Sequence, residues 1–351
     1  MTARAALLLS LAATCLAAPA RADDPEYERE RALVRLHPGG SIAPILAAYG
    51  LTLAPGDSIP SRGLYLLTLP EGADEPALIA LLSTDPRIAS ADFNFFADDS
   101  NPEGSSRRMY LNIAREGYDS DPTPSRVSAP AAWSQSTGFG VTVAVLDTGV
   151  DSAHPLLAGR TAPGGYNFVL RNSDTRDIAR GVDSNDNGEF DQMVGHGTMI
   201  AGLITRIAPE AMVLPVVVMD SDGRSTTFRL VQGVYHAIDR GAQVINISMV
   251  TEADPPLLRL ALTDAAAAGN SGSDNPVLPA SSNLAGVVAV AATTFTDELA
   301  PFSGYGPWIA LCAPGAEVVS TAPGGTYGIA SGTSLSAPIV AGGAALVRSI
   351  C

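Results

Sequence analysis

The stretch VTVAVLD, at Val141–Asp147, is a short and nearly continuous apolar run that ends in a carboxylate. Runs without polar alternation are typical of strands buried on both faces of a sheet. Three similar runs follow, separated by stretches long enough for helices: MVLPVVVM at 212–219, QVINISM at 243–249 and GVVAVAAT at 286–293. The pattern predicts an α/β fold in which a parallel β-sheet is flanked by helices on both faces.

In such sheets the chemistry lies at the carboxyl ends of the strands, where the first run places Asp147. His196 stands between two glycines in GHGTMIAGLI, at the start of an apolar helix, and Ser334 lies at a helix start in SGTSLSAP. Taken singly, these residues have ordinary interpretations: a turn-starting aspartate, a satisfied histidine and a helix-capping serine. Their common setting in glycine-rich junctions favours a shared site.

The three residues follow the chain order aspartate, histidine, serine, which is the order found in subtilisins. The spacings are 49 residues from Asp147 to His196 and 138 from His196 to Ser334. Across 127–348 the chain resembles the subtilisin-like serine proteases, the subtilases. Other stretches that look like the family are AAW ending at Trp133, AQVINIS ending at Ser248, LPA at 278–280, and APFSGYGPWIALCAPGAEVVST at 300–321.

The resemblance implies a serine endopeptidase that acts on polypeptides and needs no cofactor for catalysis. Ser334 would attack the peptide carbonyl, His196 would take its proton, and Asp147 would orient the imidazole. The backbone N–H of Ser334 and the side-chain amide of Asn270 would hold the oxyanion. A carbohydrate or lipid hydrolase is disfavoured because Ser334 lacks the G-x-S-x-G elbow. Residues 248–251 (SMVT) depart from the family's glycine-rich form, so its pocket preferences do not transfer.

The segment before Asn270 departs from the family. Only 22 residues separate Ser248 from Asn270, fewer than subtilases usually have. The alanine-rich stretch PPLLRLALTDAAAAG at 255–269 favours a helix, whereas the family motif requires a strand. A short helix with a poor strand and an intact helix with no strand both remain open. The second would give the alternative function, a catalytically impaired or inactive subtilase-like binding or remnant protein.

The order of segments predicts a secreted or periplasmic precursor. Residues 1–22 carry a basic start, an apolar run and a small-residue cleavage pattern, which together predict a signal peptide. Residues 29–98 predict a small α+β, ferredoxin-like unit that resembles the subtilase propeptide, an intramolecular chaperone and inhibitor. A linker is expected over 99–126. The catalytic domain would span 127–351 and be short at its C-terminus, because Cys351 follows Ser334 by 17 residues.

Composition limits the partners. The chain has 36 acidic and 21 basic residues, for a net charge of −15, which disfavours binding to nucleic acid. No membrane-length apolar run follows the leader. The loop DSNDNGEFD at Asp183–Asp191 starts like a calcium loop but lacks its twelfth-position acid, so structural calcium and a solvated acidic loop both remain open. Cys312 and Cys351 permit one disulfide and do not require it.

Overall fold

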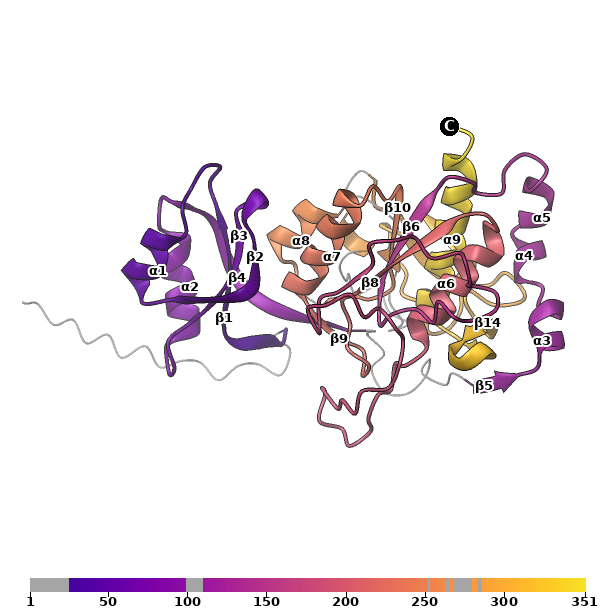
Figure 1. Ribbon diagram of the computed structural model, residues 1–351, viewed down its shortest axis with the longest axis horizontal. Helices are drawn as coiled ribbons and strands as arrows, with labels where there is room; N and C mark the ends of the chain where they lie inside the picture. Colours follow the sequence, from indigo (N-terminus) through magenta and orange to yellow (C-terminus); the bar gives the residue numbers. More distant parts are fainter. Residues whose placement is uncertain (1–24, 99–109, 252, 263–265, 268–279, 283–285) are drawn as a thin grey trace, which may run out of the picture.

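The computed structural model describes residues 25–98, 110–251, 253–262, 266–267, 280–282 and 286–351. The predicted signal peptide lies outside these residues. Figure 1 shows a small N-terminal unit, drawn in indigo and violet, beside a larger C-terminal unit. In the described part of the chain, no helix is long and apolar enough to cross a membrane.

The N-terminal unit has the β-α-β-β-α-β connectivity expected of a ferredoxin-like fold. Its elements are β1 (Tyr27–Leu36), α1 (Ala43–Tyr49), β2 (Thr52–Ile59), the 3-10 turn η1 (Pro60–Arg62), β3 (Leu64–Thr68), α2 (Glu75–Ser83) and β4 (Ile88–Asp98). The strands pair antiparallel in the order β2-β3-β1-β4. Alternate residues of β3 face opposite sides: Tyr65 and Leu67 pack beneath α1 and α2, whereas Leu64 and Leu66 pack against the C-terminal unit.

The C-terminal unit is built on a seven-stranded sheet in which every pairing is parallel. The order is β13-β12-β11-β10-β6-β8-β7. The strands are β6 (Thr142–Asp147), β7 (Tyr166–Asn167), β8 (Met212–Val217), β10 (Val244–Ile247), β11 (Ala266–Ala267), β12 (Ala289–Thr293) and β13 (Leu311–Pro314). The predicted parallel sheet is therefore confirmed, and each of the four apolar runs supplies one strand.

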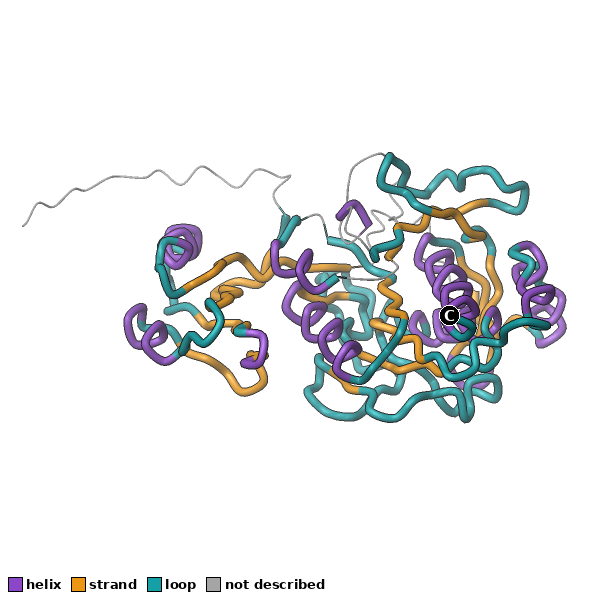
Figure 2. Tube along the Cα trace, turned by 90° about the horizontal axis from the view of Figure 1, so that it is seen from above, coloured by secondary structure: helices purple, strands orange, loops and turns teal. Residues whose placement is uncertain are grey.

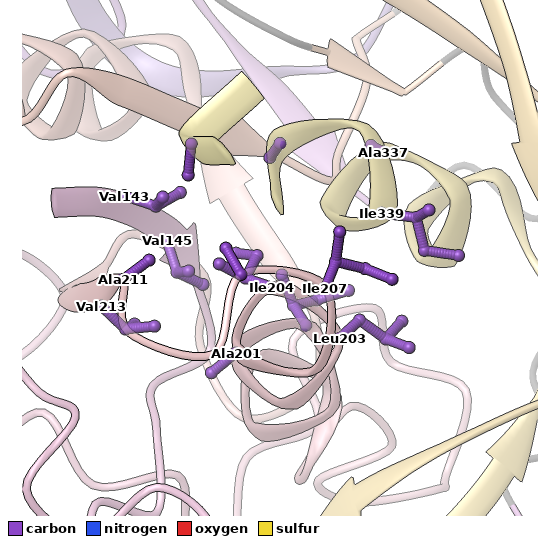
Figure 3. Close-up of a cluster of buried hydrophobic side chains, with 14 of the residues drawn as sticks. Val143, Val145, Ala201, Leu203, Ile204, Ile207, Ala211, Val213, Ala337 and Ile339 are labelled. Atoms are coloured by element: carbon purple, nitrogen blue, oxygen red, sulfur yellow. The ribbon is translucent and has the colours of Figure 1, made fainter. Parts of the chain in front are cut away.

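Helices cover both faces of this sheet, which explains why its strands are mostly apolar and show no polar alternation. On one face, Val143 and Val145 of β6 pack against α6 (His196–Ile207) and α9 (Thr333–Arg348), as Figure 3 shows. On the other face, Ala144 and Leu146 pack against α7 (Thr227–Asp239) and α8 (Pro256–Ala261). The view in Figure 2 shows α7 and α8 between the parallel sheet and the N-terminal unit.

The alanine-rich segment forms both a helix and a strand. The helix α8 ends at Ala261, and β11 pairs parallel with β10 on one side and with β12 on the other. Hydrogen bonding to two neighbouring strands overrides the helix propensity of alanine, because β-structure depends mainly on context. The outcome is thus a short helix followed by a two-residue strand. The alternative in which the strand is lost is wrong.

The predicted linker is in part folded. Residues 110–126 form β5 (Tyr110–Ile113), α3 (Arg115–Ser120) and α4 (Thr123–Arg126), followed by α5 (Ala129–Ala132). Strand β5 pairs antiparallel with β15 (Thr326–Ala330), which pairs with β14 (Val318–Ala322) after the 3-10 turn η3 (Pro323–Gly325). A buried ion pair of 3.1 Å joins Asp121 to Arg206 of α6. Tertiary contacts of this kind fix a proline-rich segment that has no periodicity of its own.

Candidate active site

A buried carboxylate–imidazole pair lies at the carboxyl end of β6. Asp147 is the last residue of that strand, and His196 is the first residue of α6. The Nδ1 of His196 lies 2.8 Å from Oδ1 and 3.0 Å from Oδ2 of Asp147. A carboxylate accepts hydrogen bonds, so this contact places the imidazole proton on Nδ1 and leaves Nε2 as the basic nitrogen.

Glycine allows α6 to approach the end of β6 this closely. A Cβ at Gly197 would lie 2.1 Å from the carbonyl oxygen of Gly149 and 3.1 Å from Oδ1 of Asp147. The helix begins at the N-cap Gly195, whose φ of 97° is in the left-handed region that favours glycine. The glycines beside His196 therefore permit both the turn into α6 and its contact with the aspartate loop.

Ser334 is buried as the second residue of α9, after the N-cap Gly332. It is therefore not the capping residue of that helix. Its carbonyl oxygen accepts a hydrogen bond of 3.1 Å from the Ser248 hydroxyl, which in turn accepts one of 2.8 Å from the amide of Asn246. These contacts fix the start of α9 to the end of β10.

Small residues hold the histidine helix and the serine helix together on one face of the sheet. A Cβ at Gly342 of α9 would lie 2.7 Å from the Cβ of Ile207 in α6. A Cβ at Gly202 of α6 would lie 2.1 Å from the hydroxyl of Thr321 in β14. Because α6 and α9 pack against the strand that ends at Asp147, three segments distant in sequence meet at this part of the fold.

Sequence analysis missed a second buried carboxylate, Asp177, behind the pair. It accepts four hydrogen bonds, from Gly195 N at 2.9 Å, Thr198 N at 3.0 Å, the Thr198 hydroxyl at 2.7 Å and the Thr148 hydroxyl at 3.2 Å. Burial raises its pKa to about 6 although the hydrogen bonds from Gly195 and Thr198 act to lower it. Asp177 stands in an irregular polar loop, where neither periodicity nor spacing distinguishes it from its neighbours.

The edge of the candidate site is paired with the N-terminal unit. The last residues of β4 pair antiparallel with β9 (Arg224–Thr226), and Asp98 also bridges to Val250 on the other side. Val250 lies two residues after Ser248, which contacts the start of the serine helix. The β4 strand thus ends beside the segment that anchors Ser334.

Asn270, the Asp183–Asp191 loop and the two cysteines are the other features predicted from the sequence. Asn270 lies outside the described residues. In the Asp183–Asp191 loop, Asp183 accepts the backbone N–H groups of Asn187 and Gly188, at 3.1 and 2.9 Å. Burial raises the pKa of Asp191, but hydrogen bonds from Ser221 and three backbone N–H groups outweigh burial and lower the pKa to about 2. The described residues contain no group of three acidic, histidine or cysteine side chains placed for a metal. Cys312 and Cys351 are both exposed and not bonded to each other.

Comparisons with known proteins agree with this geometry. The subtilase family model matches residues 138–350. Thermitase of Thermoactinomyces vulgaris is 38% identical over 244 residues, covering 64% of this chain and 81% of that protein. A thermophilic serine proteinase of Bacillus sp. (strain AK1) is 33% identical over 292 residues, covering 78% of this chain and 66% of that protein. The fold superposes on fervidolysin from Fervidobacterium pennivorans with a TM-score of 0.71 at 22% identity, covering 93% of this chain and 55% of that one.

The parallel sheet and the buried aspartate–histidine pair, with the serine-bearing helix beside it, define a serine protease of the subtilisin type. This chain belongs to the subtilase family. It spans just over half the length of fervidolysin and most of the length of thermitase.

Proposed function

We propose that this chain is a secreted serine endopeptidase in which Asp147, His196 and Ser334 form the catalytic triad. The observation that carries the proposal is the buried contact of 2.8 Å between Asp147 and His196 Nδ1, made where α6 and the serine-bearing α9 share one face of the sheet. A purely structural role for His196 would not require both a carboxylate at Nδ1 and a serine at the start of a neighbouring helix.

The proposed reaction proceeds through an acyl-enzyme. Nε2 of His196 removes the hydroxyl proton of Ser334 as the serine oxygen attacks the peptide carbonyl, and Asp147 stabilises the imidazolium that forms. The imidazolium then protonates the leaving amine, and water hydrolyses the ester by the same proton transfers in reverse order. Backbone N–H groups at the start of α9 would stabilise the negative charge that develops on the carbonyl oxygen of the substrate, because the N-terminus of a helix carries partial positive charge.

We propose Asn270 as the side-chain donor to the oxyanion. The support for this role is the A-A-G-N-x-G motif and the position of β11, which ends at Ala267, three residues before Asn270, and is paired inside the sheet. Replacing Asn270 by alanine should lower kcat by about 10²–10³ with little change in KM, the loss seen when such a donor is removed from a subtilisin.

Covalent labelling of Ser334 tests the proposed activity. A fluorophosphonate should label the wild-type chain at Ser334 and leave Ser334→Ala unlabelled, and only the wild type should hydrolyse a peptide p-nitroanilide. The Ser248→Ala variant keeps the Ser334 hydroxyl but removes the contact with the start of α9, so it shows how much of a loss comes from a disturbed helix start alone. A folded wild-type chain that neither reacts nor cleaves would refute the protease and favour the non-catalytic member of the family.

We further propose that residues 29–98 act as an inhibitory propeptide that remains docked until it is cleaved away. The support is the interface itself. Residues 96–98 of β4 pair with β9, and Asn94 Oδ1 accepts the backbone N–H of Phe228 at the start of α7 at 2.9 Å. Leu64 and Leu66 are buried against α7 and α8, and Asp57 forms an ion pair with Arg171. A segment held as a strand between β9 and Val250 prevents a second peptide from pairing with the same backbone groups.

The proposal that the chain is an exported precursor can be tested by finding the N-termini of the exported protein. Residues 1–22 would be removed by signal peptidase and the N-terminal unit by the protease itself. Expression in a bacterial host, with N-terminal sequencing of the exported protein, should give one end after Ala22 and a second end beyond Asp98. In Ser334→Ala only the first end should appear. The same second end in Ser334→Ala would show that another protease performs the cleavage.

A further inference from the structure

The Asp177 carboxylate accepts hydrogen bonds from the backbone on both sides of His196. It accepts the N–H of Gly195, immediately before His196, and the N–H of Thr198, two residues after it. The N–H of the intervening residue, Gly197, donates to the hydroxyl of Thr148 at 3.1 Å. The backbone on both sides of His196 is therefore held by Asp177 and by a residue that Asp177 contacts.

The hydroxyl of Thr148 links the two buried carboxylates. Its oxygen lies 3.2 Å from Oδ1 of Asp177 and 3.3 Å from Oδ1 of Asp147. One hydroxyl proton thus faces two carboxylate acceptors, while the oxygen accepts from Gly197. Asp147 also accepts the backbone N–H of Thr148 at 2.8 Å. The orientation of the Asp147 carboxylate is consequently coupled to the position of Asp177.

The start of α6 needs an acceptor from outside the helix. Its N-cap, Gly195, has no side chain that could accept the N–H of Thr198, the third residue of α6. Asp177 is 1% exposed and accepts this N–H, and that of Gly195, from a separate loop. A negative charge is favourable there because the N-terminus of a helix carries partial positive charge. With a pKa of about 6, raised by burial, the carboxyl is largely ionised at neutral pH.

We propose that Asp177 is a positioning residue of the protease: its carboxylate, acting through the start of α6 and through Thr148, holds the Asp147–His196 pair in the geometry required for proton transfer. The inference rests on the proposed function. It differs from a simple stabilising role, because catalysis is far more sensitive to geometry than folding is. A displacement of about 1 Å at a catalytic group can reduce the rate by about 10²-fold.

Asp177→Asn is the first test. The amide has the size of the carboxylate, but its NH₂ group replaces an accepting oxygen. It therefore lies against N–H and O–H donors whose hydrogen bonds it cannot accept. We expect kcat on a peptide p-nitroanilide to fall by about 10²-fold, and fluorophosphonate labelling of Ser334 to slow in parallel, with KM changed by less than about twofold. Rates are expressed per active site, titrated with the fluorophosphonate, and circular dichroism verifies that the variant is folded at the assay temperature.

Asp121→Asn is the matched control. It removes a buried carboxylate that pairs with Arg206 in the last turns of the same helix, far along α6 from His196. This variant should lose thermal stability and keep the wild-type kcat. If Asp121→Asn lowers kcat as much as Asp177→Asn at an equal loss of stability, the role of Asp177 is structural only and the inference is wrong.

A pair of substitutions at Thr148 keeps the inference testable if Asp177→Asn fails to fold. Thr148→Val removes the bridging hydroxyl with little change of shape and should lower kcat, whereas Thr148→Ser restores the hydroxyl and should recover most of that loss. Equal rates for the two variants would overturn the coupling. If the wild-type chain itself is not labelled at Ser334, the proposed function fails, and that result is distinct from a labelled wild type whose Asp177→Asn variant is equally fast.

Discussion

Asp98 and Val250 exchange both of their backbone hydrogen bonds. The N–H of Asp98 donates to the carbonyl of Val250 at 3.0 Å, and the N–H of Val250 donates to the carbonyl of Asp98 at 2.9 Å. One residue belongs to the last strand of the N-terminal unit and the other follows the strand that anchors the serine helix. The last strand of the N-terminal unit is therefore hydrogen-bonded to the segment that contacts the start of α9.

Weakening the docked face of the N-terminal unit should expose the site sooner. Leu66 is 5% exposed and packs against α7 and α8, so Leu66→Ala removes about 2–5 kcal/mol of packing from that contact. The time course of fluorophosphonate labelling of the full chain should therefore accelerate. Leu81→Ala is the control, because Leu81 on α2 is 52% exposed. Equal labelling rates for both variants would contradict the inhibitory contact.

Two adjacent glycines of α9 should respond oppositely to a methyl group. A Cβ at Gly342 would lie 2.7 Å from Ile207, whereas a Cβ at Gly343 meets nothing within 4 Å. Gly342→Ala should destabilise by about 1–3 kcal/mol through overpacking. Gly343→Ala should stabilise by about 0.5–1 kcal/mol because alanine is the better helix former. Thermal denaturation in the Ser334→Ala background, which prevents self-cleavage, measures both changes, and a tolerated Gly342→Ala would refute the close packing of α6 and α9.

The free energy of unfolding should depend on pH through the titration of Asp177. Its pKa is about 6 in the folded state and 3.8 in its ordinary state, so the folded protein binds this proton more tightly. Its contribution to the free energy of unfolding is therefore full below about pH 3.8 and is lost as the pH rises through about 6. Asparagine does not titrate, so the stability advantage of wild type over Asp177→Asn should be greater at pH 4 than at pH 7.5. Urea denaturation of both chains in the Ser334→Ala background checks the sign, and an advantage that grows with pH would contradict the raised pKa.

The Asp183–Asp191 loop should hold its shape without calcium. Asp183 accepts two backbone N–H groups, and its removal by Asp183→Ala should lower the melting temperature. Because these oxygens already have protein donors, the loss should be equal in EDTA and in millimolar calcium. Glu189→Ala, at an exposed residue of the same loop, should change little. A loss that occurs only with calcium present would establish a metal site here.

The sequence alone predicted those features that depend on short-range pattern. Four apolar runs predict buried parallel strands because a strand covered on both faces needs an apolar side chain at every position. His196 and Asp147 could also be singled out from the sequence, because their immediate neighbours determine where they lie: glycines flank His196, and an apolar strand ends at Asp147. The structure brings Nδ1 of His196 to 2.8 Å from Oδ1 of Asp147.

Tertiary structure alone decided features in which distant segments outweigh local preference. The run around Ala266 favours a helix locally but lies between β10 and β12, whose backbone groups hold it as a strand. The segment around Asp121 has no periodicity and is fixed by Arg206 of α6. Asp177 shows nothing in sequence that separates it from a surface aspartate. Its role arises only because folding buries its carboxylate against the start of the histidine helix, where burial and hydrogen bonding act on it from several segments at once.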